Sequence, residues 1–233
     1  MSQDSVKTRG PFGAGSLDQA PANAIGLYAW YARPVLGRGD WANDGSGGDA
    51  DKAVEQFLAA LQNHSNRMTP PDVNLKGQSP FGQTWAGSIS IDSLDSPMTY
   101  KSHLAEETGR EAVARVLTDA PPTFAAPVYI GVTDNLRRRL MQHMTALQLV
   151  YGARSREPSV MTQSYDFGEL GSEIDNVFAI RAIDAGFAPD HMIVWVLDFS
   201  ELTQRMGREA TYKVAKAAEL TLNRWYRPLL GRR

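Results

Sequence analysis

The sequence predicts an α/β protein of the α+β type, in which a small three-stranded sheet is flanked by helices. Three short runs rich in β-branched and aromatic residues, at 25–32, 127–132 and 192–197, are typical of strands. Segments with apolar residues at helical spacing follow the second and third runs. Residues 33–125 separate the first two strands, which predicts a large insertion that is mostly helix and loop.

Composition places the chain among ordinary globular proteins. Of its 233 residues, 42% are hydrophobic and 21% are charged, and there is no cysteine. The lack of cysteine excludes disulfides, zinc ribbons and thiol nucleophiles. Neither a run of about 18 apolar residues nor a secretory signal is visible, so we expect a cytoplasmic protein with no membrane partner.

The first half of the chain predicts an arm, a strand and the insertion. Residues 1–24 are rich in Gly, Ser, Pro and charge, which predicts a flexible arm. The strand at 25–32 (IGLYAWYA) begins the core. Within the insertion we expect helices near 51–63 and 102–118. The stretch between them is turn-rich and carries one weak strand signal, an alternation of Trp85, Gly87, Ile89 and Ile91.

The second half completes a core that comprises 25–32 and 126–233. The strand at 127–132 is followed by a helix at about 135–150, whose buried stripe is Leu136, Leu140, Met144 and Leu147. A helix at about 170–185 precedes the strand at 192–197. The last helix, at about 207–226, stops before a proline and is expected to face inward with Val214, Ala218, Leu222 and Trp225.

A group of polar and aromatic residues near this sheet suits phosphate chemistry. Tyr28 and Tyr129 lie on the first two strands. Arg139 and His143 are four residues apart and therefore share one helix face. Glu219 lies among apolar residues in the last helix. The neighbouring aromatic cluster of Tyr28, Trp30 and Tyr31 fits a sheet core better than a base-stacking platform.

Charge adds a second hint of a phosphate-containing partner. The last 30 residues hold eight Lys and Arg residues against two Glu. Such a basic end can contact phosphates, and it fits an ordinary solvated helix face equally well. The candidates for nucleic-acid contact are Arg137, Arg138, Lys216 and Arg224, with Arg137 and Arg138 divided evenly between phosphate contacts and solvated charges.

Four elements in order resemble the GIY-YIG nuclease superfamily. Gly26-Leu27-Tyr28 is a conservative variant of the first motif, and Tyr129-Ile130-Gly131 is the second motif intact. The family's Leu-x-x-Arg-Leu-x-x-His pattern is matched by Leu136, Arg139, Leu140 and His143. Glu219 precedes Pro228 by nine residues, as the family's metal-binding glutamate precedes a proline. The chain departs from the family in its long separation of the two motifs.

The resemblance implies a role for each residue. Glu219 would hold Mg²⁺ or Mn²⁺, and Arg139 would bind the scissile phosphate. One of Tyr28 and Tyr129 would orient or deprotonate the attacking water, if nearby cations lower its pKa. His143 would position this network. The family often has Asn three residues after the proline, where this chain has Gly231, and Asn223 is the candidate replacement.

The resemblance also implies a metal-dependent DNA endonuclease, of a restriction or phage-defence type. Its partner would be double-stranded DNA, and cutting both strands favours a homodimer or higher homo-oligomer. Residues 33–125 would then recognise DNA or mediate dimerisation. The alternatives are a catalytically decayed nucleic-acid-binding subunit, a structure-specific repair nuclease, and a protein whose α/β core is only a scaffold.

Overall fold

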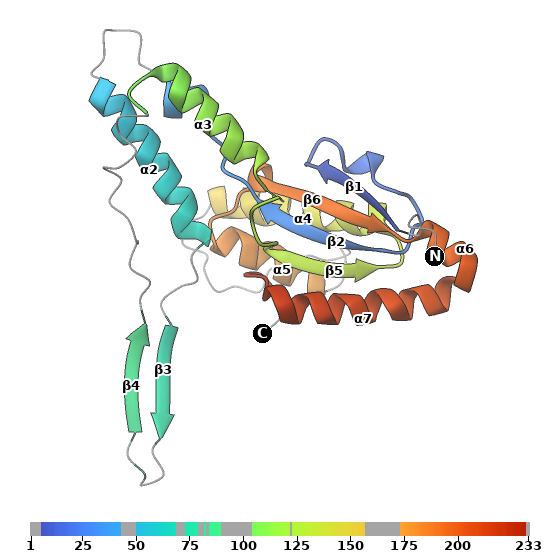
Figure 1. Cartoon of the computed structure of the whole chain (residues 1–233). Helices are drawn as coiled ribbons and strands as arrows, with labels where there is room; N and C mark the ends of the chain where they lie inside the picture. The colour runs from blue at the N-terminus through green and yellow to red at the C-terminus, as the bar shows by residue number, and fades with distance from the viewer. Residues whose placement is uncertain are drawn as a thin grey trace. The chain divides into compact units, whose positions relative to one another are not determined.

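The protein is an α+β structure that divides into two compact units (Figure 1). The computed structural model describes residues 6–42, 50–68, 73–78, 82, 84–89, 104–121, 123–156 and 173–231. Met1–Val35 and Leu117–Arg233 form the first unit, and Leu36–Val116 form the second. Among the described helices, none is long and apolar enough to cross a membrane.

The first unit is built on an antiparallel sheet with the strand order β1-β6-β2-β5. Its strands are β1 (Lys7–Phe12), β2 (Gly26–Ala32), β5 (Tyr129–Thr133) and β6 (Met192–Asp198). The three expected strands are present, but the prediction of a three-stranded sheet is wrong. The fourth strand, β1, comes from the segment expected to be a flexible arm, and Arg9 on it pairs with Asp198 of β6. The arm lacks a strand-like apolar pattern, so only pairing with β6 reveals this strand.

Alternation along β2 gives the sheet two different faces. Tyr28, Trp30 and Ala32 are buried on one face, where Trp30 packs against Phe178 with ring centroids 5.8 Å apart. This face is covered by α4 (Leu136–Arg156) and α5 (Glu173–Asp184). The predicted buried stripe of α4 is confirmed, since Leu136, Leu140, Met144 and Leu147 are all buried.

The other face is covered in part by α7 (Arg208–Tyr226), which follows α6 (Ser200–Met206). Leu27 and Ala215 belong to the cluster that joins this helix to the sheet. The expectation that Val214 and Trp225 face inward is wrong, because they are 45% and 71% exposed. The inward stripe instead contains Thr211, Ala215, Ala218 and Leu222. Small residues on this stripe allow close packing, and Val214 lies about 100° around the helix from Ala215.

The second unit contains three helices and a hairpin. The helices are α1 (Arg38–Trp41), α2 (Ala50–Met68) and the start of α3 (Glu107–Asp119), and the hairpin pairs β3 (Val73–Gln78) with β4 (Thr84–Ile89). The weak strand signal covers β4, whereas β3 had no signal. Among the described residues of the first unit, two short 3₁₀ helices are present, η1 (Leu17–Gln19) and η3 (Pro189–His191).

A buried arginine organises the second unit. Val54, Phe57, Leu104 and Ala114 form its apolar cluster. The Arg110 side chain is fully buried beside them, and it donates to the backbone carbonyls of Trp41, Leu104 and Ala105 at 2.7–2.9 Å. The guanidinium therefore satisfies the backbone of two loops that lie far apart in the sequence.

We expect Arg110→Met to destabilise the second unit by about 3 kcal/mol or more, because it removes charge-assisted hydrogen bonds and leaves buried carbonyls unsatisfied. Urea unfolding and limited proteolysis of the 36–116 region would measure the effect. Arg115→Met is the matched control, since Arg115 is exposed on the same helix and pairs only locally with Glu111. Equal stability of the two variants would contradict this role.

Candidate active site

The candidate site lies at the edge strand β5, where a glycine leaves room for a tyrosine. Gly131 is the register partner of Tyr28 on β2. A β-carbon at position 131 would collide with the hydroxyl and ring of Tyr28 and approach its Cζ to 2.5 Å. A side chain at position 26 would likewise strike the Leu197 carbonyl and Leu136. The glycines of both motifs are therefore required by close approach of their neighbours.

Tyr28 links the sheet to two residues of α4. Its hydroxyl lies 2.9 Å from His143 Nε2, and Arg139 Nε donates to the same hydroxyl at 3.4 Å. The hydroxyl accepts from Arg139, and the tautomer of His143 sets which group donates in the contact between the hydroxyl and Nε2. The four-residue spacing of Arg139 and His143 on α4 makes this arrangement possible.

An aromatic cluster surrounds this hydrogen-bond chain. The ring of Tyr129 lies 6.1 Å from that of Tyr28 and 4.9 Å from that of Phe178, between centroids. The imidazole of His143 lies edge-on to Phe178 at 4.7 Å. The cluster excludes water from His143 and Tyr28, which are both almost completely buried.

Burial decides how both groups ionise. It raises the pKa of Tyr28 far above its ordinary value, and the nearby Tyr129 hydroxyl adds to this effect, while Arg139 opposes it. The neighbouring cation does lower the pKa of Tyr28, but burial outweighs it, so the net lowering that the hypothesis required is absent at Tyr28. Burial lowers the pKa of His143 to about 3, and the positive charge of Arg139 contributes. Both side chains are therefore neutral at pH 7.

Helix α7 supplies the second wall of the site. Tyr212, Lys216, Glu219 and Asn223 follow one another at spacings of four, three and four residues, so they form one stripe. This stripe lines a cavity of about 470 Å³ together with Tyr28, Tyr129 and Arg139. Lys216 Nζ lies 2.5 Å from Glu219 Oε2. Residues far apart in the chain therefore meet at one cavity.

The structure brings most of the predicted site residues to this cavity. Its lining includes Tyr28, Tyr129, Arg138, Arg139, Lys216, Glu219 and Asn223. His143 does not line it and lies behind Tyr28. Arg137 is directed elsewhere, because its Nε donates to the Ala20 carbonyl at 2.8 Å. Arg224 is exposed on α7 outside the cavity lining.

Sequence reasoning did not identify four further polar residues of the lining, which are Thr133, Asp134, Gln142 and Tyr212. Gln142 lies three residues after Arg139, and Tyr212 lies one turn before Lys216. Helical spacing from the predicted residues was therefore the available signal for both. Gly231 also lines the cavity, at the position where the resemblance leads one to expect asparagine.

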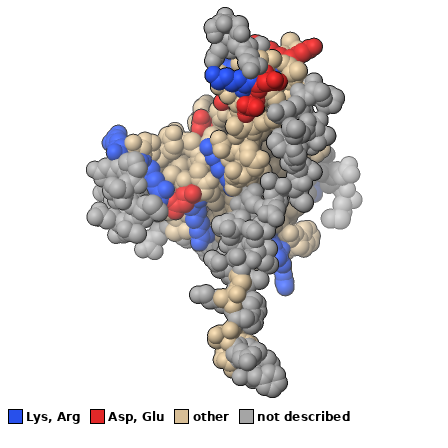
Figure 2. All heavy atoms as spheres, turned by 90° about the vertical axis from the view of Figure 1, so that its left-hand side faces the viewer, with Lys and Arg blue, Asp and Glu red and all other residues tan. Residues whose placement is uncertain are grey.

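The cavity suits an anion with a bound cation. Its charged lining residues are Arg138, Arg139, Lys216, Asp134 and Glu219. On the face shown in Figure 2, Lys and Arg atoms lie interspersed with Asp and Glu atoms among the described residues.

The carboxylate in the cavity lining fits a divalent ion that takes most of its ligands from a bound substrate and from water. Among the residues that the structure describes, no group of three or more His, Cys, Asp or Glu is placed to hold a metal. Glu219 nevertheless brings a carboxylate into the cavity beside Arg139. Mg²⁺ commonly takes one or two carboxylates and fills its other positions with phosphate oxygens and water.

Comparison with known proteins identifies no relative of this chain. No family model, curated protein or solved structure matches the chain. A functional assignment therefore depends on the motif residues and on their placement around the cavity.

We expect Gly131→Ala to displace Tyr28 and to destabilise the first unit by about 1–3 kcal/mol, because the added methyl group overpacks a tight contact. Thermal unfolding would measure the loss. Gly13→Ala is the matched control, since a β-carbon at position 13 meets no atom within 4 Å. If Gly131→Ala unfolds at the wild-type temperature, the close approach is not a constraint.

Acidification should destabilise the fold through His143. The pKa of His143 is about 3 in the folded chain, below its ordinary value of about 6.5. Between these values the unfolded chain binds a proton that the folded chain does not. The free energy of unfolding that is linked to His143 therefore decreases as the pH falls from about 6.5 towards 3, by about 1.4 kcal/mol per pH unit.

Urea unfolding of wild type and His143→Gln between pH 7 and pH 4 would test this dependence. Glutamine does not titrate and can still accept a hydrogen bond from Tyr28. The wild type should lose stability more steeply than the variant over this range. Parallel pH profiles would show that His143 is not held neutral by the fold.

Proposed function

We propose that the chain is a metal-dependent DNA endonuclease of the GIY-YIG type, which hydrolyses phosphodiester bonds. The observation that carries the proposal is the cavity in which Tyr28, Arg139 and Glu219 meet from β2, α4 and α7. Each residue alone is common on a strand or helix. Their meeting in one cavity, in the order that the resemblance implies, favours a common chemical role.

The topology of the first unit supports the same proposal. The strand with the first motif is central and pairs with the strand of the second motif. In the chain, β5 leads directly into α4, so Arg139 returns to the sheet beside Tyr28. A GIY-YIG-like core extended by β1, and interrupted by the second unit, accounts for this arrangement.

Arg139 and Glu219 are assigned the charge-bearing roles. The planar guanidinium of Arg139 can donate two hydrogen bonds to the scissile phosphate and neutralise charge that develops in the transition state. Glu219 would hold Mg²⁺ or Mn²⁺, and the bound ion would supply charge neutralisation and a more acidic water. Lys216 and Arg138 add positive charge near the DNA backbone.

Tyr28 is assigned a positioning role in which it remains protonated. With its pKa raised, the phenol is not the general base at pH 7. Its hydroxyl is hydrogen-bonded to His143, and its oxygen accepts from Arg139 and holds the guanidinium at the cavity. Tyr129 and Asn223 also line the cavity and can hydrogen-bond the attacking water or a phosphate oxygen.

The wider biological assignment follows from this proposal. A restriction or phage-defence enzyme acting on double-stranded DNA as a homodimer fits a small catalytic unit with one large insertion. The second unit would then recognise DNA or join two copies. The catalytically decayed alternative is disfavoured, because the cavity retains the arginine and the carboxylate together.

The test is cleavage of plasmid DNA with Mg²⁺ or Mn²⁺. Wild type should cut, and EDTA should abolish cutting. Glu219→Gln should reduce the rate by about 100-fold or more, as expected for loss of a group that stabilises transition-state charge. Arg139→Lys should lose a similar factor, because lysine keeps the charge without the planar fork.

Glu209→Gln provides the matched control. Glu209 lies on the same helix and pairs with Lys213, much as Glu219 pairs with Lys216, but it does not line the cavity. This variant should cut at the wild-type rate. Absence of cleavage on any DNA substrate, or normal cleavage by Glu219→Gln, would refute the enzymatic assignment.

A further inference from the structure

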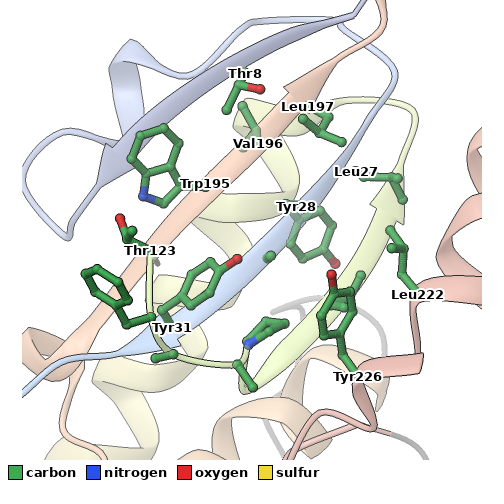
Figure 3. Close-up of a pocket in the computed structure, with 16 residues that line it drawn as sticks. Thr8, Leu27, Tyr28, Tyr31, Thr123, Trp195, Val196, Leu197, Leu222 and Tyr226 are labelled. Carbon is green, nitrogen blue, oxygen red and sulfur yellow. The ribbon is translucent and has the colours of Figure 1, made fainter. Parts of the chain in front are cut away.

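A second cavity of about 650 Å³ opens on the other face of the sheet (Figure 3). Its floor includes Ala29, Tyr31 and Ile130 from β2 and β5, and Trp195 from β6. Figure 3 shows Tyr31 and Trp195 on one side, with Leu222 and Tyr226 of α7 on the other. Residues 123–127 form a further wall. The volume lies within the roughly 300–1,000 Å³ that is usual for small-molecule sites.

The cavity exists because the cover on this face is incomplete. Helix α7 packs on the sheet through Leu27 and Ala215, near one end of β2. Towards the other end, Ala29 is small and Tyr31 is only partly buried. Tyr31 therefore faces this cavity and not the packed core, although the sequence favoured a core position for it.

The lining defines the chemistry of an occupant. None of the 16 lining residues is Asp, Glu, Lys, Arg or His. Aromatic rings come from Tyr31, Phe124, Trp195 and Tyr226. Tyr31 and Tyr226 bring two phenols to the lining, and the pKa of Tyr31 is raised by burial and by the nearby Tyr226. Such a site favours a flat, neutral, hydrogen-bonding group and disfavours a phosphate, whose charge would be desolvated without a partner.

This aromatic cavity adjoins the candidate active site. The two cavities share Tyr28 and Ile130 in their linings. Helix α7 forms a wall of both, with Asn223 in the active site and Leu222 in the aromatic cavity. Tyr31 lies three residues along β2 from Tyr28, or about 10 Å between their backbone positions, and its side chain points to the opposite face of the sheet. A DNA strand rises about 3.4 Å per nucleotide, so this distance corresponds to roughly three nucleotides.

We propose that the aromatic cavity binds one unstacked nucleobase of the DNA substrate, about two to four nucleotides from the scissile phosphate. The inference rests on the proposed function, because it needs DNA at the active site. The base stacks between the aromatic side chains and hydrogen-bonds with the phenols, while the scissile phosphate of the same strand lies near the cations of the other cavity. Unstacking lets the protein distinguish bases by their exposed edges.

The test measures the affinity of the chain for DNA by fluorescence anisotropy in EDTA, where no cutting occurs. All duplexes contain the mapped cleavage site. In each duplex one base is missing from the complementary strand, opposite a different position along the cut strand. Removing that partner lowers the cost of unpairing the base that enters the cavity. We expect a gain in affinity of about tenfold at positions two to four nucleotides from the cut, and little elsewhere.

Substitutions in the aromatic cavity test whether the gain in affinity arises from binding of a base there. Tyr226→Ala removes an aromatic wall, and Ala126→Trp fills the opening; both positions are exposed, so the fold should be retained. Each should abolish the gain. Trp225→Ala is the matched control, because Trp225 is an exposed aromatic residue on the same helix that does not line the cavity. It should keep the gain.

The outcomes separate the two proposals. No gain at any position, or an unchanged gain in Tyr226→Ala and Ala126→Trp, overturns the base site. If plasmid cleavage persists in that case, the nuclease assignment stands. A chain that neither cuts nor binds any duplex overturns both.

Discussion

The hydrogen bond between Tyr28 and His143 joins the central strand to the helix that packs on it, and the candidate site depends on it. Both side chains are buried, so the contact between the Tyr28 hydroxyl and His143 Nε2 is shielded from water. Gly131 provides the space in which the tyrosine ring crosses the edge strand. Arg139 reaches the same hydroxyl from one turn away on α4. A single buried contact thereby places a phenol and a guanidinium at the cavity.

Burial of this pair also changes the chemistry that the motif residues can perform. A tyrosine close to an arginine suggests an acidic phenol, but desolvation outweighs the attraction and raises the pKa of Tyr28. In the proposed nuclease, proton abstraction would belong to another group, and Tyr28 would position Arg139. Glu219 approaches from α7 and meets Arg139 at the cavity, where a carboxylate and a guanidinium can act on one phosphate.

Helix α7 relates the two cavities of the first unit. One stripe, with Lys216, Glu219 and Asn223, faces the polar cavity. Leu222 and Tyr226 border the aromatic cavity. A charged cavity and a neutral aromatic cavity thus both border this helix, and they share Tyr28 and Ile130 in their linings. If both bind the same DNA strand, the position of α7 sets the spacing between cut and recognised base.

Local periodicity was sufficient to predict the strands of β2, β5 and β6, the buried stripe of α4, and the shared face of Arg139 and His143. These features depend on spacing within one element, which the sequence alone determines. Three features were decided by the tertiary structure: the pairing of β1 with β6, the rotation of α7 that exposes Val214 and Trp225, and the raised pKa of Tyr28. Each depends on contacts between distant segments, because strand pairing, helix approach and desolvation are set by the neighbours that folding supplies.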